Sequence, residues 1–244
     1  MKTFDQIHLT YLSITILFYI IGGIVMRKSN KVVQYTVLII MTVVVMFGIF
    51  FRYAMGLNFH TNINDLNFKI LAMEMLQVCN FNFILLPLAL IPKFKLFRQY
   101  LLFFSIFGAM TSLISVPSSF KSLDALNISI INSWLNHALT VGIGIFIIAS
   151  RVDKPRIKYI IPVTIGVFIY FSVVAIISYY LIRKGVIMPE NSFSFIYDRG
   201  KTAGFSFFYK ICPVDYFYLY LIFPILIGFF VGLGYSFKKY KIKN

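Results

Sequence analysis

The sequence has little charge for its length. Only 13% of the 244 residues are charged, whereas 59% are hydrophobic and the mean hydropathy is +0.84. A soluble domain of this size would have about a quarter of its residues charged. So much apolar surface cannot be buried in one water-soluble core. The composition therefore excludes a soluble globular domain and favours an integral membrane protein.

Acidic residues and cysteines are also scarce. Eight Asp and Glu residues stand against 23 Lys and Arg, and the formal net charge is +15. Two cysteines, Cys79 and Cys212, are too few for a disulfide framework or a zinc site, and His137 has no partner at ligand spacing. No phosphate-binding glycine loop or nucleic-acid-binding motif is present. We therefore expect no metal, no cofactor and no nucleic-acid partner.

The apolar residues come in runs of about 18 to 25, long enough to cross the hydrocarbon layer as helices. Short alternating segments typical of membrane strands are missing. The pattern predicts an all-α, polytopic transmembrane bundle of about seven spans that forms a single integral membrane domain over residues 1–244. The expected spans are Leu9–Met26, Val32–Phe51, Lys69–Ile91, Phe97–Val116, Ile128–Ser150, Lys158–Ile182 and Phe217–Phe237.

Basic residues gather in alternate connections, at the ends of the apolar runs. The positive-inside rule then places the amino terminus outside and the carboxyl terminus inside a cell membrane. We expect these side chains to meet lipid headgroups, and His8 and His60 to lie at the outer membrane edge. The inner basic residues are Arg27, Lys28, Lys31, Lys93, Lys95, Arg98, Arg151, Lys154, Arg156, Lys158, Lys238, Lys239, Lys241 and Lys243.

The span over Ile128–Ser150 has one polar stripe. At about 100° per residue its polar side chains fall within an arc of about 140°. Interhelical hydrogen bonding would explain the Ser, Thr and Asn residues, whereas an imidazole at this depth also points to a functional role. The stripe consists of Ser129, Asn132, Ser133, Asn136, His137 and Thr140.

The span over Lys69–Ile91 has polar residues around its whole circumference. Such a helix should pack centrally or be locally distorted, and Pro87 should kink it. Near the outer surface, Arg52 and Lys69 are candidate contacts to a lipid phosphate, although basic residues at span ends commonly only anchor a helix. Glu74 also lies near the outer end and could reach headgroup water. The polar residues of this span are Glu74, Gln77, Cys79, Asn80 and Asn82.

Cys79 and His137 are expected at matching depth. Each lies nine or ten residues into its span, which is about 14 Å below the outer boundary at about 1.5 Å per residue. A thiol that loses its proton to a histidine becomes a nucleophile. A lone cysteine is more often a small buried hydrophobe, and whether the two spans touch is left open by the sequence.

Several short motifs accompany these two residues. Val78-Cys79-Asn80 precedes the apolar stretch Ile84–Ile91 and the basic turn Lys93-Phe94-Lys95, and Asn136-His137-Ala138 lies in a later helix. From about the third span onward the chain thereby resembles the bacterial membrane proteins of the YwaF type, which are related to the eukaryotic transmembrane protein 164. Weaker matches are Gly108-Ala109, Pro117 and Cys212-Pro213-Val214-Asp215-Tyr216, without the Trp-rich character of that last family segment.

The resemblance implies lipid acyl transfer without acyl-CoA, with Cys79 as nucleophile and His137 as base. A fatty acyl group would move from a phospholipid or lipoprotein to a lysolipid or other acceptor through a Cys thioester, with membrane lipids as substrates. Gln77, Asn80 or Asn136 could then donate a hydrogen bond to the tetrahedral oxyanion. The other candidate substrate contacts are Asn132, Ser133, Glu74 and Arg52.

Two other classes of function remain open. Polar stripes at mid-membrane also line the paths of transporters and the sites of small-molecule-binding subunits, although acidic residues for ion coupling are few. A non-catalytic assembly factor would instead use the long, aromatic-rich outer loop over residues 183–216 as its contact surface.

Overall fold

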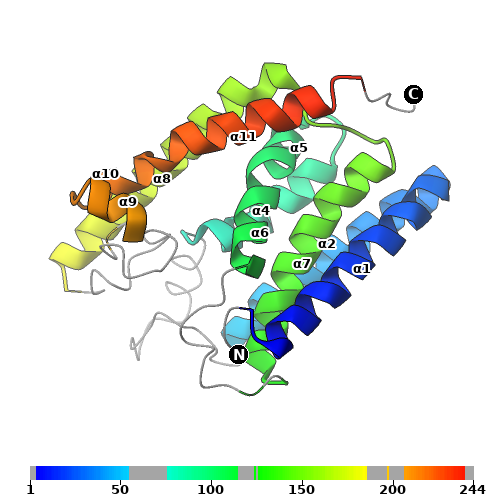
Figure 1. Ribbon diagram of the computed structural model, residues 1–244, viewed down its shortest axis with the longest axis horizontal. Helices are drawn as coiled ribbons and strands as arrows, with labels where there is room; N and C mark the ends of the chain where they lie inside the picture. The colour runs from blue at the N-terminus through cyan, green and yellow to red at the C-terminus, as the bar shows by residue number, and fades with distance from the viewer. Residues whose placement is uncertain are drawn as a thin grey trace.

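The computed structural model describes residues 4–54, 76–114, 124, 126–185, 197 and 206–239. Every regular element within these ranges is a helix (Figure 1). Among the described residues, six helices are long and apolar enough to cross a membrane. The chain is therefore a multi-pass integral membrane protein, as its composition predicts.

The six long helices agree with six of the expected spans to within a few residues, because apolar runs bounded by charges mark their own ends. Three of them are single elements: α1 (Gln6–Lys28), α2 (Lys31–Ala54) and α7 (Ile128–Ala149). The other three are built from consecutive elements: α5 (Lys95–Tyr100), the π-helical segment η1 (Leu101–Ser105) and α6 (Ile106–Ile114); η3 (Ile157–Tyr159) and α8 (Ile160–Arg183); and α10 (Phe217–Tyr220) and α11 (Ile222–Ser236). A short helix, α9 (Ser206–Ile211), precedes α10.

The remaining expected span, Lys69–Ile91, is not one continuous helix. Its described part is α4 (Val78–Leu90), and Gln77 just before it has extended backbone, with φ −75° and ψ 126°. Residues 69–75 lie outside the described ranges. The expectation of local distortion is thus confirmed at Gln77, whereas that of an unbroken span is wrong. Pro87 lies inside α4, one turn before its end.

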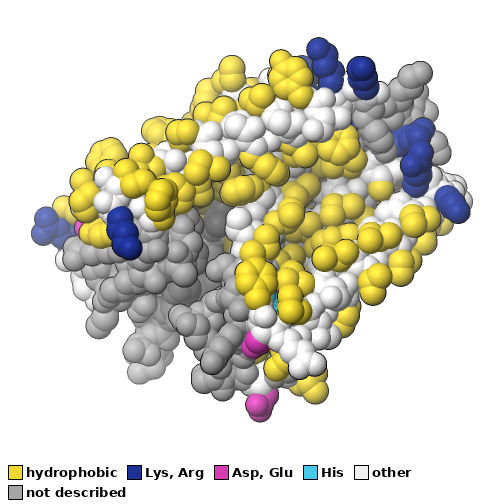
Figure 2. Space-filling model, in the orientation of Figure 1, with side chains coloured by type: hydrophobic (Ala, Val, Ile, Leu, Met, Phe, Trp, Pro, Cys, Tyr) yellow, Lys and Arg dark blue, Asp and Glu magenta, His cyan; other side chains and the backbone are white. Residues whose placement is uncertain are grey.

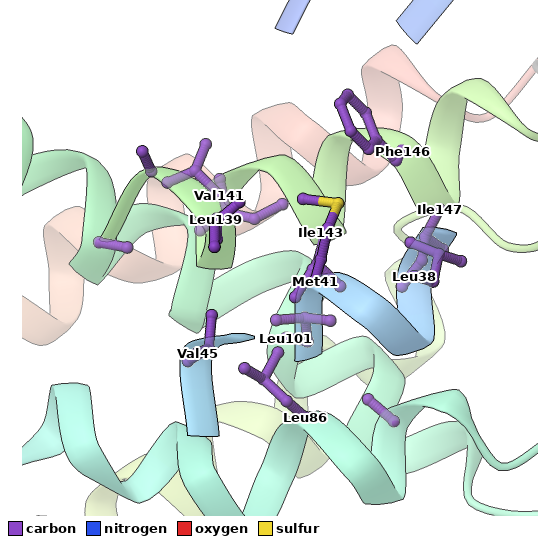
Figure 3. Close-up of a cluster of buried hydrophobic side chains, with 14 of the residues drawn as sticks. Leu38, Met41, Val45, Leu86, Leu101, Leu139, Val141, Ile143, Phe146 and Ile147 are labelled. Atoms are coloured by element: carbon purple, nitrogen blue, oxygen red, sulfur yellow. The ribbon is translucent and has the colours of Figure 1, made fainter. Parts of the chain in front are cut away.

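Helix α7 is central to one half of the bundle, where it packs against α1, α2 and α6. Two of its glycines make close approach possible. A methyl group on Gly144 would overlap the Ile106 side chain, and one on Gly142 would lie 3.0 Å from both Met41 and Phe18. Figure 3 shows the buried core between these helices, to which Leu38 and Met41 of α2, Leu86 of α4 and Ile143 of α7 contribute.

The other half of the bundle consists of α8 and α11, which lie side by side (Figure 1). They pack against α5 and η1 through aromatic side chains, such as Phe103 against Phe230 with ring centroids 5.2 Å apart. Helix α4 packs against α2 and against the run from α5 to α6. It therefore lies between the two halves, as its all-round polar pattern predicts.

The connections rich in basic residues gather at one end of the bundle. The α1–α2 turn, the α7–α8 connection and the end of α11 all lie at the upper right of Figure 1, where Figure 2 shows dark blue side chains. Lys154 Nζ there donates to the Lys238 carbonyl at 3.1 Å. This agrees with the charge pattern behind the predicted orientation, which itself stays a prediction.

Two side chains expected at the membrane surface are buried. Arg98 is 5% exposed and pairs with Asp153, its NH1 lying 3.6 Å from Asp153 Oδ2. His8 is 0% exposed, because the chain before α1 folds back: Phe4 N donates to His8 Nδ1 at 2.7 Å, and His8 Nε2 donates to the Leu113 carbonyl at 2.8 Å. The expectation of headgroup contact is wrong for Arg98, since it finds a partner distant in sequence. The place of His8 at the outer membrane edge stays a prediction.

Candidate functional site

Cys79 lies in the first turn of α4. Asn80 N and Phe81 N both donate to the Gln77 carbonyl at 2.9 Å, so the helix begins here, and the Gln77 side chain does not cap it. The first N–H groups of a helix have no partner within it, and the helix dipole adds positive potential. A negative charge on the Cys79 sulfur would be stabilised at this position.

The Cys79 thiol faces α6. Its Sγ lies 3.9 Å from Ser112 Oγ, and that hydroxyl also lies within hydrogen-bonding distance, 3.2 Å, of the Gly108 carbonyl. One turn further along α4, Asn82 Oδ1 accepts from Ser105 Oγ at 2.8 Å. These two contacts fix α4 against the run from η1 to α6 and thereby orient the thiol.

His137 is held by its own helix. Its Nδ1 lies 2.7 Å from the Ser133 carbonyl oxygen. A carbonyl can only accept, so Nδ1 carries the hydrogen, and in the neutral ring Nε2 then has the lone pair. This is the tautomer that a base working through Nε2 requires.

The asparagines of the polar stripe face α2 at Gly48. Asn132 Nδ2 donates to the Gly48 carbonyl at 3.2 Å, and a methyl group on Gly48 would overlap Asn136 Oδ1. Asn132 thus makes an interhelical hydrogen bond, which is the structural role predicted for the Ser, Thr and Asn residues of the stripe. Asn136 differs, because its Oδ1 is buried and accepts no hydrogen bond from any residue that the structure describes.

Cys79 and His137 belong to helices with shared neighbours. Helices α4 and α7 both pack against α2 and α6, and the Cys79 thiol itself faces α6. The structure therefore brings the two helices to the same part of the bundle. Contact between the thiol and the imidazole stays a prediction.

A comparison with known families gives one match. The model of the TMEM164 family matches residues 3–233, nearly the whole chain. The chain belongs to the TMEM164 family. That family is linked to acyltransferase activity. No curated protein and no solved structure shows significant similarity to the chain.

The match to the TMEM164 family model includes α1 and α2. It therefore covers more of the chain than the resemblance predicted from the sequence, which began at about the third span. The narrower likeness to the YwaF type stays a prediction. Of the candidate substrate contacts, Gln77 and Asn80 are buried beside Cys79, and Ser133 supplies the carbonyl that holds His137. Glu74 lies outside the described residues, as does the side chain of Arg52 at the end of α2.

Sequence reasoning missed the residues around α4 that other helices of this TMEM164-family chain supply. Tyr170 of α8 donates to the Leu76 carbonyl at 2.6 Å, and its ring stacks on Phe81 with centroids 4.8 Å apart. Ser112 and Tyr100 come from the span over Phe97–Val116, and the few polar residues of that span could have identified it as a neighbour of the site. Gly48 could have indicated a close helix contact, because it is the only glycine in α2.

Proposed function

We propose that this protein is an intramembrane acyltransferase that works through a thioester on Cys79, with His137 as the base. The observation that carries the proposal is the place of the Cys79 thiol, on the first turn of a helix that begins inside an apolar bundle. Backbone that breaks from helix at this depth is tolerated only where protein or a wet cavity surrounds it. Family membership supports the reaction class.

The first half-reaction moves the acyl group to the enzyme. His137 Nε2 accepts the thiol proton, and the thiolate attacks the ester carbonyl of a phospholipid or lipoprotein acyl chain. When the tetrahedral intermediate collapses, the ester C–O bond breaks, and the departing alkoxide takes the proton from His137. The products are an acyl-Cys79 thioester and a lysolipid or deacylated lipoprotein.

The second half-reaction repeats these steps with a new acceptor. A lysolipid hydroxyl or an amine gives its proton to His137 and attacks the thioester carbonyl. The C–S bond breaks, and the thiolate recovers the proton from His137. With water as the acceptor the same steps would hydrolyse the thioester, so the acceptor decides between a transferase and a hydrolase.

The oxyanion of each tetrahedral intermediate needs hydrogen-bond donors. The backbone N–H groups of Val78 and Cys79 at the start of α4 are candidates, and the side-chain amides of Gln77, Asn80 and Asn136 are others. One such donor typically contributes about 10²–10³ in rate. Asn132, Ser133, Glu74 and Arg52 remain proposed substrate contacts, and the cell membrane remains the proposed location.

Intact-protein mass spectrometry after incubation with phospholipid vesicles tests the proposal. The wild type should gain the mass of one acyl group, Cys79→Ala should not, and His137→Ala should acylate far more slowly. Cys212→Ala is the matched control and should acylate like the wild type, since no disulfide joins Cys212 to Cys79. Equal lipid turnover by the wild type and Cys79→Ala would sink the proposal.

A transporter or small-molecule-binding subunit is the second candidate. The break before α4 favours it, because transporters place substrate sites at discontinuous helices. A flux or binding assay separates the two functions: transport that depends on Glu74 and survives Cys79→Ala would favour the transporter.

A further inference from the structure

An apolar cavity of about 450 Å³ lies between α4, α5 and α8. That volume falls within the range of about 300–1,000 Å³ typical of small-molecule sites. Its wall is almost wholly hydrocarbon and includes Leu85, Leu96, Pro162, Gly166 and Val173. Such a lining fits an apolar ligand.

The cavity runs lengthwise along α8. Its wall extends from Pro162 to Val174, 12 residues apart, which corresponds to about 18 Å at about 1.5 Å per residue. At the far end, Tyr170 and Leu76 are joined by their hydrogen bond, immediately before the first turn of α4. The cavity is therefore long and narrow, and one end lies beside the helix start that holds Cys79.

The cavity opens sideways. Wall residues Ile84, Ile169 and Val173 are exposed on the outer surface of the bundle. In a membrane-spanning chain such a surface meets lipid acyl chains rather than water. A ligand can thus enter from the hydrocarbon layer.

One polar group in the wall lacks a partner. The Tyr100 side chain is 8% exposed, and its hydroxyl makes no hydrogen bond within the described ranges. Tyr100 lines the same cavity as Tyr170 and Leu76. A buried hydroxyl without a partner is costly, and the carbonyl of an ester would accept from it.

We propose that this cavity binds the acyl chain of the donor lipid, with the ester end toward Leu76 and Cys79 and the chain end toward Pro162. The length, the apolar wall, the sideways opening and the single unpartnered donor together match one acyl chain. The orientation rests on the proposed function, because it presents the ester carbonyl to the start of α4.

Gly166 provides a way to fill the cavity. It lines the wall, and a Cβ there would meet no atom within 4 Å. Gly166→Phe should therefore occupy the cavity without disturbing the helices. Gly232 of α11 is the matched control, because it is also exposed with open space around it and does not line the cavity.

The test uses vesicles of phosphatidylcholine that carries a photoreactive diazirine near the end of one acyl chain. Cross-links in the wild type should concentrate on peptides from α4, α5 and α8. Gly166→Phe should lower this yield by roughly 10-fold or more, since apolar pockets discriminate to this degree even for one methylene, and Gly232→Phe should leave it unchanged. Cross-links spread evenly over the lipid-facing helices, or insensitive to Gly166→Phe, would overturn the proposal.

The same experiment in Cys79→Ala separates binding from chemistry. Cavity cross-links should persist there, because the wall does not include Cys79. If they persist while the wild type forms no acyl adduct, the proposed function fails and the cavity stands. If the adduct forms and cross-linking ignores Gly166→Phe, the cavity proposal alone fails.

The Tyr100 hydroxyl gives a second measurement. The wild type should cross-link the ester lipid more strongly than an ether-linked analogue, which lacks the carbonyl, and Tyr100→Phe should abolish that preference. An equal preference in both proteins would contradict the assigned orientation.

Discussion

At the scale of single residues, the position of one proton decides what His137 can do. The Ser133 carbonyl holds the hydrogen on Nδ1 and leaves the lone pair on Nε2. Cys79 has a comparable local support, since it lies where a helix begins. In the proposed mechanism, backbone groups of its own helix thus prepare each residue for proton transfer.

Replacing His137 should therefore expose the need for a base. His137→Ala should slow Cys79 acylation by roughly 10²–10⁴-fold, measured as the rate of adduct formation by mass spectrometry. Raising the pH should restore part of that rate, because hydroxide then ionises the thiol directly. An unchanged rate at neutral pH would show that His137 is not the base.

Gly48 tests how the polar stripe packs. Gly48→Ala should lower the free energy of unfolding by about 1–3 kcal/mol through overpacking, because the new methyl group overlaps Asn136 Oδ1. Thermal unfolding in detergent measures this loss. In the double variant Gly48→Ala/Asn136→Ala, the two losses in unfolding free energy should not add, since the residues share one contact. Strictly additive losses would contradict the close approach of Gly48 to Asn136.

At the scale of elements, an internal ion pair ties α5 to the connection between α7 and α8. Asp153 is 2% exposed and contacts both Arg98 and Arg156. Gln99 adds two hydrogen bonds of 2.9 Å, to the Lys154 carbonyl and from Arg156 N. This junction sets the start of α8 relative to α5, and hence the Pro162 end of the cavity.

Breaking the pair should be costly. Asp153→Asn leaves the Arg98 guanidinium buried without its counter-ion, and we expect a loss of about 3–5 kcal/mol in the free energy of unfolding. Lys158→Gln, an exposed cation at the same end, should change it by less than about 0.5 kcal/mol. Equal effects of the two substitutions would show that the pair is not a stabilising element.

Tyr197, which lies between α8 and α9 in the sequence, contacts α8. Its hydroxyl donates to the Ala175 carbonyl at 3.3 Å. Burial, and then the neighbouring Tyr216 and Asp215, raise the pKa of Tyr197 from 10.0 to about 12. Because the folded state holds this proton more tightly than the unfolded state, the stabilising contribution is complete below pH 10 and is lost as the pH rises toward 12.

Stability measured between pH 10 and 12 should therefore fall less steeply in Tyr197→Phe than in the wild type. The difference between the two curves isolates Tyr197 from the other tyrosines. Parallel curves would show that the Tyr197 phenol ionises alike in the folded and unfolded chain.

At the scale of the whole molecule, the sequence is most informative where physics is local. Apolar runs ending in charges predicted the long helices closely, and the asparagine stripe of α7 was correctly expected to face protein. Arg98 was misplaced because its partner, Asp153, is remote in the sequence. The burial of His8 against the Leu113 carbonyl was missed for the same reason. The contact of Ser112 with Cys79 and the shape of the cavity wall could not be predicted either, because both depend on how separate helices pack together.

In the proposed reaction, the sideways opening of the cavity makes the bilayer the solvent. A donor lipid that enters the cavity between the exposed side chains of Ile84, Ile169 and Val173 never crosses the aqueous phase. The enzyme would then sense the mole fraction of its donor among the surrounding lipids rather than the amount of lipid in the sample. Diluting the donor with an inert lipid should slow turnover, whereas adding water to the same vesicles should leave turnover per enzyme unchanged.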